Sequence, residues 1–226
     1  MIYNNIVKGK FISRPNRFIA HVEIDGKLEV CHVKNTGRCK ELLIPGATVF
    51  LQVSDNPSRK TKYDLISVYK GDMLVNMDSQ APNKVFGEWA VNSGWFGDIE
   101  FIKPECRYKN SRFDFYIEAN GKRIFVEVKG VTLENNGVVS FPDAPTERGI
   151  KHINELVEAM EDGYETYVCF IVQMPRCTYF TPAVDKHPEF AQALKNASEN
   201  GVGIIALNCN VTSTLLKVKD FVDVCL

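Results

Sequence analysis

The stretch RFDFYIEANGKRIFVEVKG, residues 112–130, determines how the second half of this chain folds. Asn120-Gly121 is typical of a two-residue hairpin turn, and the residues on both sides alternate between apolar and polar, as a half-buried strand pair requires. Asp114 lies near the end of the first predicted strand. Successive side chains of a strand point to opposite faces, so Asp114 should lie on one face and the apolar residues on the other: Phe113, Phe115 and Ile117.

Two charged residues of the second predicted strand should face Asp114. Glu127 and Lys129 alternate with apolar residues, and the hairpin is expected to bring Glu127 close to Asp114 across the ladder. Two carboxylates at that distance repel each other, and Mg²⁺ favours such oxygen ligands together with water and a phosphate. Lys129 would then stabilise an attacking hydroxide or the charge on a phosphodiester. The alternative is a solvated strand face on which Lys129 only neutralises its neighbours.

Short strands separated by turns fill the first 80 residues. Turn sequences such as Asp25-Gly26 and Gly71-Asp72 separate six apolar segments. The segments are residues 5–14, 17–24, 27–33, 47–54, 63–70 and 72–77. This number of strands suits a small barrel, and an OB-like barrel is attractive because that fold often binds nucleic acid. Strand count alone leaves other small barrels open.

Helices and strands alternate after residue 80, so we place a domain boundary between residues 1–80 and 81–226. Helices are predicted over residues 83–94, 146–162 and 187–201. Strands are predicted over residues 101–108, 111–119, 122–133, 166–174 and 201–211. A central mixed sheet flanked by helices is the economical arrangement. The predicted fold class is therefore α+β, with an OB-like barrel followed by an α/β domain.

Composition and charge restrict the classes of function. The 226 residues have a formal net charge of -1, which argues against a protein that coats polyanions with its whole surface. Residues 1–85 carry 13 basic and 8 acidic side chains, and residues 86–226 carry 14 and 20. The 7 cysteines are scattered, so neither a zinc site nor a disulfide framework is expected. The sequence contains no apolar run long enough to cross a bilayer, and its first residues do not resemble a signal peptide. We therefore expect a cytoplasmic protein with no membrane partner.

Four segments resemble the sugar fermentation stimulation protein family, SfsA: HVKNTGRCKELLIPG, SRFDF, VEVKGVTL and FPDAPTERGIKH. They occur in the family's order and spacing, and the resemblance covers nearly the full chain. The order of helix, Asp-bearing strand, E-V-K strand, helix and further strand is also similar to the core of the PD-(D/E)xK nuclease superfamily. The resemblance implies an OB-like N-terminal domain, a nuclease-like C-terminal domain and DNA binding without marked sequence preference. It also implies a link to the control of sugar use.

The superfamily pattern implies a set of site residues. Asp114 matches the metal-binding Asp, Glu127 the second carboxylate and Lys129 the catalytic lysine. Glu88, on the helix before the hairpin, matches a further acidic metal ligand that many members carry, although an exposed helix residue would fit the sequence equally well. Phe113 stands where the superfamily usually has a proline. The implied metal is Mg²⁺ or Mn²⁺.

Basic residues supply the predicted nucleic-acid contacts. Cations near the start of the helix predicted over residues 146–162 could receive a phosphate, because free backbone N–H groups there favour an anion. The alternative is that Arg148 and His152 pair with nearby glutamates on the surface. The simple interpretation of the segment HVKNTGRCK is a tight turn with solvated charges. A polar turn with three cations on a small barrel could instead bind a phosphate backbone, and the family resemblance favours this nucleic-acid role. The predicted nucleic-acid-binding residues are Lys34, Asn35, Thr36, Arg38, Arg112, Arg148 and Lys151.

The sequence thus predicts a DNA-binding protein with a metal-dependent nuclease site, in which an activated water attacks the phosphodiester. The alternative is a non-catalytic DNA-binding regulator of sugar (maltose-type) metabolism that retains the nuclease fold. The trio of Asp114, Glu127 and Lys129 favours catalysis, because a site without a reaction would be free to lose Lys129. RNA is an alternative ligand. The oligomeric state stays open, a homodimer included.

Overall fold

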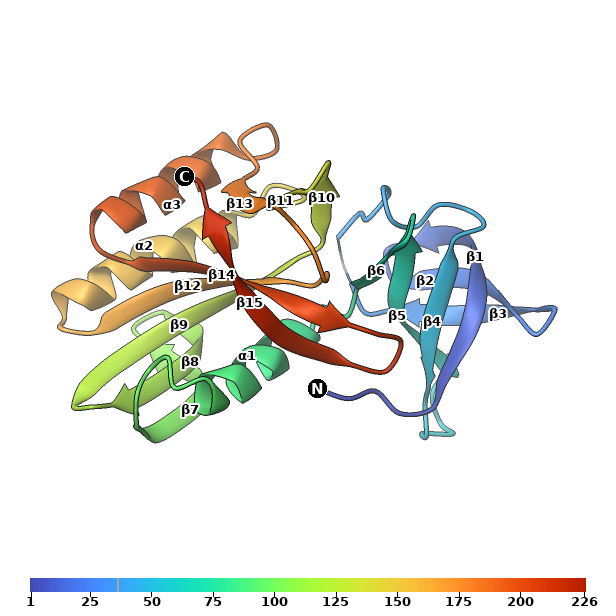
Figure 1. The fold of residues 1–226 in the computed structure, drawn as a ribbon, viewed down its shortest axis with the longest axis horizontal. Coiled ribbons are helices and arrows are strands. Elements are labelled where there is room, and N and C mark those ends of the chain that lie inside the picture. Colours follow the sequence, from blue (N-terminus) through green and yellow to red (C-terminus); the bar gives the residue numbers. More distant parts are fainter. Residues whose placement is uncertain (36) are drawn as a thin grey trace.

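A six-stranded sheet lies at the N-terminal end of the chain, and its first five strands close into a barrel (Figure 1). The computed structural model describes residues 1–35 and 37–226. The strand order is β3-β2-β1-β4-β5-β6, and a parallel pairing of β3 with β5 closes the barrel. Val22, Val49 and Leu65 fill its interior and have no exposed surface. This confirms the predicted OB-like barrel. The strands are β1 (Ile6–Asn16), β2 (Ile19–Ile24), β3 (Lys27–Val33), β4 (Thr48–Val53), β5 (Tyr63–Lys70) and β6 (Met73–Asn76).

A mixed sheet forms the rest of the molecule, with strand order β10-β11-β13-β15-β14-β12-β9-β8-β7. The pairs β9–β12 and β12–β14 are parallel, and β7, β8 and β9 pair antiparallel. The strands are β7 (Ile99–Tyr108), β8 (Ser111–Ala119), β9 (Lys122–Val131), β10 (Leu133–Asn135), β11 (Val138–Phe141), β12 (Glu165–Val172), β13 (Tyr179–Pro182), β14 (Gly203–Val211) and β15 (Leu216–Val224). The chain order of α1, the hairpin strands β8 and β9, α2 and β12 agrees with the predicted order of helix, Asp-bearing strand, E-V-K strand, helix and further strand.

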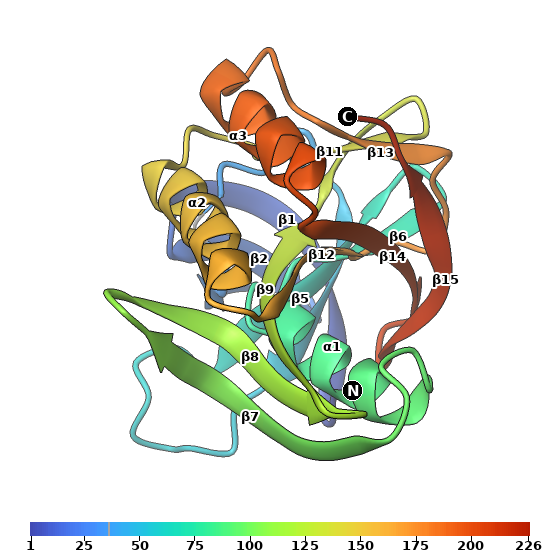
Figure 2. The same ribbon diagram turned by 90° about the vertical axis from the view of Figure 1, so that its left-hand side faces the viewer.

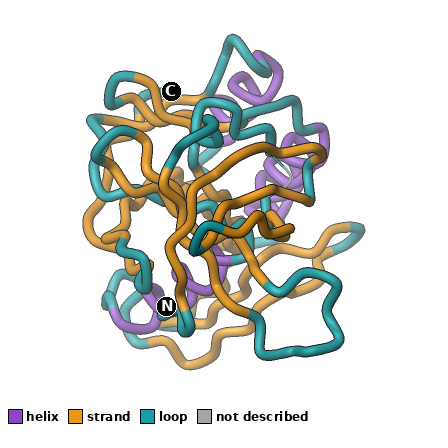
Figure 3. The backbone as a smooth tube through the Cα atoms, turned by 90° about the vertical axis from the view of Figure 1, so that its right-hand side faces the viewer, coloured by secondary structure: helices purple, strands orange, loops and turns teal. Residues whose placement is uncertain are grey.

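Helices cover both faces of this sheet (Figure 2). Helix α1 (Ala81–Asn92) packs on one face, and α2 (Glu147–Glu161) and α3 (Pro188–Glu199) pack on the other. Strands and loops make up the barrel side of the molecule (Figure 3). Within residues 1–35 and 37–226, no helix is long and apolar enough to cross a membrane.

The hairpin of β8 and β9 forms as predicted, with one departure. Positive φ angles of 50° at Asn120 and 72° at Gly121 match a two-residue hairpin turn. The ladder runs from the turn to the pair of Phe115 with Val126 and is not continued to Asp114. Beyond this point Phe113 turns to the α2 face and packs against Phe125, with ring centroids 5.0 Å apart. The expectation that Phe113 shares a face with Phe115 and Ile117 is therefore wrong, because β8 leaves the regular ladder at Asp114.

A buried polar network joins the barrel to the second sheet. Gln173 follows β12, and its side chain donates to Asn76 Oδ1 at 2.9 Å and to the Asp78 carbonyl oxygen at 3.0 Å. The backbone N–H of Asn76 donates to the Gln173 carbonyl oxygen at 2.9 Å. Tyr3 completes the network, since its hydroxyl accepts from Asn76 at 3.0 Å. All of these side chains are buried, so their hydrogen bonds hold the two parts in a fixed arrangement.

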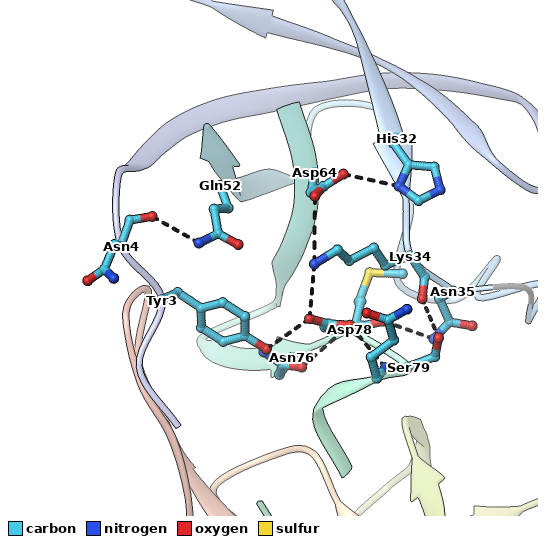
Figure 4. Close-up of polar contacts among 12 residues, drawn as sticks. Tyr3, Asn4, His32, Lys34, Asn35, Gln52, Asp64, Asn76, Asp78 and Ser79 are labelled. Atoms are coloured by element: carbon cyan, nitrogen blue, oxygen red, sulfur yellow. Dashed lines mark hydrogen bonds and ion pairs between the residues drawn. The ribbon is translucent and has the colours of Figure 1, made fainter. Parts of the chain in front are cut away.

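A charged cluster lies beside this network (Figure 4). Asp64 on β5 accepts from Arg59 at 2.5 and 2.9 Å and lies 3.0 Å from His32 Nδ1. Lys34 Nζ bridges Asp64, at 3.6 Å, and Asp78, at 3.5 Å. Burial alone would raise the pKa of Asp64, but the hydrogen bonds from Arg59 and His32 and the charge of Lys34 outweigh burial and lower it.

We expect Gln173→Ala to destabilise the protein by about 1–3 kcal/mol, because it leaves buried polar groups of Asn76 and Asp78 with fewer partners. Urea unfolding monitored by circular dichroism measures this difference. The matched control is Gln192→Ala on the exposed surface of α3, which should change the free energy of unfolding by less than about 0.5 kcal/mol. Equal effects of the two substitutions would contradict the role of the network.

We expect Asp64→Asn to cost on the order of 3 kcal/mol of stability at pH 7, because it removes the buried carboxylate that pairs with Arg59 and one of the two that pair with Lys34. The pKa of Asp64 is lowered on folding, so its charge contributes stability above the unfolded pKa, and this contribution is lost as the pH falls through the lower folded pKa. The gap between wild type and variant should therefore shrink below about pH 4. Unfolding across pH, with Asp98→Asn at an exposed site as control, checks this; a constant gap would contradict it.

Candidate active site and nucleic-acid interface

Asp114 lies where β8 separates from β9. Its Oδ2 accepts from the Val128 N–H at 2.8 Å, and its Oδ1 accepts from Asn83 Nδ2 on α1 at 2.7 Å. Burial and the charge of nearby Glu127 raise the pKa of Asp114, against the opposing effect of the Val128 and Asn83 hydrogen bonds. The Asp114 carboxylate is thus fixed in position and remains close enough to Glu127 to experience its charge.

Glu127 on β9 is a buried carboxylate with two donors on one oxygen. Lys129 Nζ donates to its Oε1 at 2.5 Å, and His152 Nδ1 lies 2.6 Å from the same atom. Arg148 Nε donates to the other ring nitrogen of His152 at 3.4 Å, which leaves the proton on Nδ1. Burial would raise the pKa of Glu127, but His152 and Lys129 outweigh burial and lower it. Glu127 therefore carries a negative charge in the core of the sheet.

The second oxygen of this carboxylate fits a metal site. Glu127 Oε2 is buried and has no hydrogen-bond partner among the residues that the structure describes. A buried acceptor is normally satisfied, so this atom calls for a donor or a cation. No group of three or more His, Cys, Asp or Glu side chains in the described ranges lies close enough to hold a metal. The pair of Asp114 and Glu127 instead suits an ion such as Mg²⁺, which takes one or two carboxylates and completes its shell with water and phosphate.

Glu88 does not belong to this pair. Its carboxylate lies 2.5 Å from the Met1 nitrogen, and more than half of its side-chain surface is exposed, at 56%. Asn83, near the start of the same helix, reaches Asp114 instead. Helix α1 therefore contributes a neutral amide to the site, where the sequence had suggested a third carboxylate.

Four cations surround a hollow next to Glu127. This hairpin hollow has a volume of about 400 Å³ and is lined by Arg107, Asn110, Ser111, Arg112, Arg148, Lys151 and His152. It lies between the turn joining β7 to β8 and the first turns of α2. His152 is only 5% exposed and contacts Glu127, so the alternative in which it pairs on the surface is wrong. The structure brings three predicted nucleic-acid-binding residues together here: Arg112, Arg148 and Lys151.

A second basic hollow opens on the barrel. This barrel hollow has a volume of about 670 Å³, and its basic lining residues are Arg14, Arg17, Arg38 and Lys40. The Arg14 guanidinium donates to four backbone carbonyl oxygens, those of Arg17, Asn35, Gly37 and Arg38. Arg38 N donates to Asp143 Oδ2 at 3.2 Å, and Ala144 also lines the hollow. The predicted residue Arg38 is exposed at the edge of this hollow.

Three other predicted residues of the barrel turn have different surroundings. Lys34 is held between Asp64 and Asp78 and is 21% exposed. Asn35 accepts from Gly37 N at 2.8 Å and donates to the Met77 carbonyl oxygen at 3.1 Å, so its side chain shapes the turn. Thr36 lies outside the described residues. Lys34 and Asn35 therefore stabilise the turn that presents Arg38.

Several residues of the site escaped the sequence analysis. Asn83 could be recognised only from its contact with Asp114, since a neutral residue in a helix carries no motif. Arg107 and Ser111 belong to the segment CRYKNSR, whose basic turn was a usable signal. Arg14 is far in sequence from the turn that it anchors, and no pattern links the two.

Family models and known proteins match this chain over nearly its full length. Residues 12–77 match a model described as the SfsA N-terminal OB domain, and residues 80–214 match one described as the sugar fermentation stimulation protein RE domain. A sugar fermentation stimulation protein homolog of Clostridium beijerinckii is 62% identical over 226 residues, 100% of both chains. A homolog from Desulfitobacterium hafniense is 61% identical over 224 residues, 99% of this chain and 98% of that one.

A solved structure agrees with this assignment. The structure of Pyrococcus furiosus SfsA in complex with Ca²⁺ is 29% identical and has a TM-score of 0.90, covering 100% of this chain and 98% of that one. Its fold thus matches the barrel and the helix-flanked sheet together. The chain belongs to the sugar fermentation stimulation protein family, SfsA.

Proposed function

We propose that this protein binds DNA without marked sequence preference and hydrolyses its phosphodiester bonds at a site formed by Asp114, Glu127 and Lys129, with Mg²⁺ or Mn²⁺. The observation that carries this proposal is the buried, unpartnered Oε2 of Glu127 beside the raised-pKa carboxyl of Asp114. Perturbed carboxyl groups close together are typical of functional sites. A carboxylate serving only structure would be expected to have both oxygens satisfied.

Binding of DNA is supported by the two basic hollows. One segment of the chain reaches both hollows. Asp143 accepts a hydrogen bond from Arg38 of the barrel hollow, and Ala144 lines that hollow. Arg148, a few residues further along, lines the hairpin hollow. A polyanionic strand that follows this segment would contact cations on both sides and pass the catalytic pair. Phosphate contacts of this kind give affinity without sequence preference.

Metal binding is supported by a relative. The related Pyrococcus furiosus SfsA was solved in complex with Ca²⁺, and this chain shares its fold at a TM-score of 0.90. Ca²⁺ and Mg²⁺ both prefer oxygen ligands, although Ca²⁺ takes more of them. Asp114 and Glu127 are the residues that would hold the ion here.

The reaction is hydrolysis. A water oxygen forms a bond to the phosphorus and the water gives up a proton to solvent; the bond from phosphorus to the leaving oxygen breaks, and the leaving oxygen takes up a proton from solvent. When bound, a divalent ion supplies charge that lowers the pKa of water and offsets the charge of the phosphate. Lys129, at 15% exposure, contributes a fixed positive charge close to Glu127 and to the charge that develops on the phosphate. His152 and Asn83 orient the carboxylates of Glu127 and Asp114.

One observation favours a second candidate, a DNA-binding regulator of sugar metabolism without catalysis. Lys129 and His152 together already compensate the charge of Glu127, so the fold is electrostatically complete without an ion. In that case the two basic hollows would bind DNA, and no phosphodiester bond would be cleaved. Cleavage assays separate the two candidates.

We expect Asp114→Asn and Glu127→Gln to abolish cleavage, and Lys129→Met to lower its rate about 10²–10³-fold, because a fixed charge close to the transition state is lost. The measurement is cleavage of labelled single- and double-stranded DNA with Mg²⁺ or Mn²⁺. DNA affinity at fixed salt should remain, because the hollows are unchanged. RNA competitors at the same salt test the alternative ligand.

The matched controls are Glu199→Gln and Lys195→Met on the exposed side of α3, which should cleave like the wild type. If wild type and all variants bind DNA yet none cleaves it, the regulator is the correct function. If Lys129→Met and Lys195→Met cleave equally well, Lys129 has no part in the reaction.

We also expect Mn²⁺ to stabilise the metal-stripped protein, by about 2.7 kcal/mol at a concentration of 100 times its dissociation constant. Glu127→Gln should remove this effect, since it removes the charge of the carboxylate that holds the ion. Thermal unfolding with and without the ion, in the absence of DNA, measures it. An equal shift in Glu127→Gln would place the ion elsewhere.

A further inference from the structure

The hairpin hollow is built differently from an ordinary basic surface. Ser111 lies on its wall and is 7% exposed, and its Oγ has no hydrogen-bond partner within the described parts of the chain. A buried hydroxyl normally finds a partner, so this one is available to donate to a ligand. Asn110 offers an amide at the same wall. The hollow therefore combines cations with neutral hydrogen-bonding groups, the combination that oriented phosphate binding requires.

The positive charge of the hollow is only partly balanced. Its four cations are Arg107, Arg112, Arg148 and Lys151. Among the described residues, two carboxylates form ion pairs with these cations: Glu105 lies 3.4 Å from Arg112, and Glu155 lies 3.8 Å from Lys151. A surplus of two positive charges remains. An internal phosphodiester carries one negative charge, whereas a phosphomonoester carries about 1.5 to 2 at pH 7.

One side chain separates the hollow from the catalytic pair. The His152 ring faces Arg148 with Nε2, at 3.4 Å, and Glu127 with Nδ1, at 2.6 Å. A phosphate in the hollow is thus held next to the site where we propose that the phosphodiester is cleaved. The phosphate bound in the hollow would therefore determine which phosphodiester bond of the strand lies at the cleavage site.

We propose that the hairpin hollow binds the terminal phosphate of a nucleic-acid strand, so that the protein acts on phosphorylated ends. This inference rests on the proposed function for the neighbouring cleavage site. Arg148 and Arg107 supply charge and directional donors, and the Ser111 hydroxyl binds a further phosphate oxygen. The terminal phosphate is recognised by its second negative charge, which an internal phosphate lacks.

The test uses one oligonucleotide sequence in four forms: with a 5′-phosphate, with a 3′-phosphate, with hydroxyl groups at both ends, and as a covalently closed circle. Fluorescence anisotropy measures affinity at fixed salt with chelator present, and cleavage is followed separately with Mn²⁺. We expect one of the phosphorylated forms to bind about tenfold more tightly than the hydroxyl form, because charge-assisted hydrogen bonds are gained. The circle should be cleaved poorly.

Variants assign the effect to the hollow. Arg148→Gln and Arg107→Gln should bring the preference for a phosphorylated end close to one, and Ser111→Ala should reduce it. Arg176→Gln is the matched control, because Arg176 is an exposed arginine that pairs with Asp72 and does not line the hairpin hollow. It should keep the full preference. All of the substituted arginines are exposed, so the variants are expected to fold.

The outcomes separate this inference from the proposed function. A phosphate preference that Arg148→Gln removes, in a protein that cleaves nothing, supports the terminal-phosphate site and overturns the nuclease. Equal binding of all four forms, with equal cleavage of circle and linear strand, overturns the terminal-phosphate site and leaves the nuclease standing. A preference that persists in Arg148→Gln and Arg107→Gln also overturns it.

Discussion

The ionised Glu127 in the middle of the second sheet is the constraint on which the rest of the site depends. A buried carboxylate is expensive unless it is paired, and Lys129 and His152 provide the pairing through one oxygen. The pairing ties β9 to α2, because His152 belongs to the helix. It also leaves the second oxygen without a partner. The same interaction that stabilises the buried charge therefore leaves free the oxygen to which we propose that a cation binds.

The departure of β8 from the ladder serves the same site. If Asp114 followed the regular pairing, its side chain would be one more residue of the strand face. Instead its carboxylate accepts the N–H of Val128 and the amide of Asn83. Phe113 turns into the α2 side at this point and helps to enclose His152, with ring centroids 6.3 Å apart. The irregularity is thus compensated by hydrogen bonds and by packing.

The site and the barrel turn are held in one arrangement. Arg14 fixes the turn around Asn35 through backbone carbonyl oxygens, and the turn contacts Asp143 in the segment that leads into α2. Gln173 joins the end of β12 to β6 on the other side of the seam. A ligand bound by the barrel is therefore placed at a defined distance from Glu127, without a flexible linker between them.

Elements with a regular hydrophobic pattern were predicted correctly from the sequence. Features that depend on a single contact between distant residues were not. Alternation and the Asn120-Gly121 turn were enough for the hairpin, and helical spacing was enough for α2. The short strands β10, β11 and β13 were not predicted, because three or four residues hold too little periodicity. The longer β15 was also not predicted, although its residues alternate.

The same distinction applies to the predicted site residues, some of which are placed by local strand geometry and others by contacts with distant segments. Glu127 and Lys129 stand at alternate positions of one strand, and Asp114 lies where the neighbouring strand leaves the ladder and is placed by its hydrogen bonds to Val128 and Asn83. Glu88 was taken from a motif in which helix position is variable, and the fold turned it toward Met1. Lys34 looked like a surface cation because two acidic partners, Asp64 and Asp78, are 30 or more residues away in sequence. Strand alternation can therefore relate the positions of neighbouring residues, whereas ion pairs between distant segments need the fold, and the roles of Asp114, Glu127 and Lys129 stay predictions.

The distribution of charge gives the final constraint on function. The chain as a whole has a net charge of -1, and residues 86–226 contain more acidic than basic side chains. Yet two hollows collect cations, one on the barrel and one beside Glu127. Long-range attraction to a polyanion is weak for such a molecule, and contacts beyond about 10 Å are screened at ordinary salt. If the protein binds DNA as we propose, its affinity must come mainly from phosphates that enter the hollows, so a strand that fits the hollows would be favoured over a long duplex that covers the whole surface.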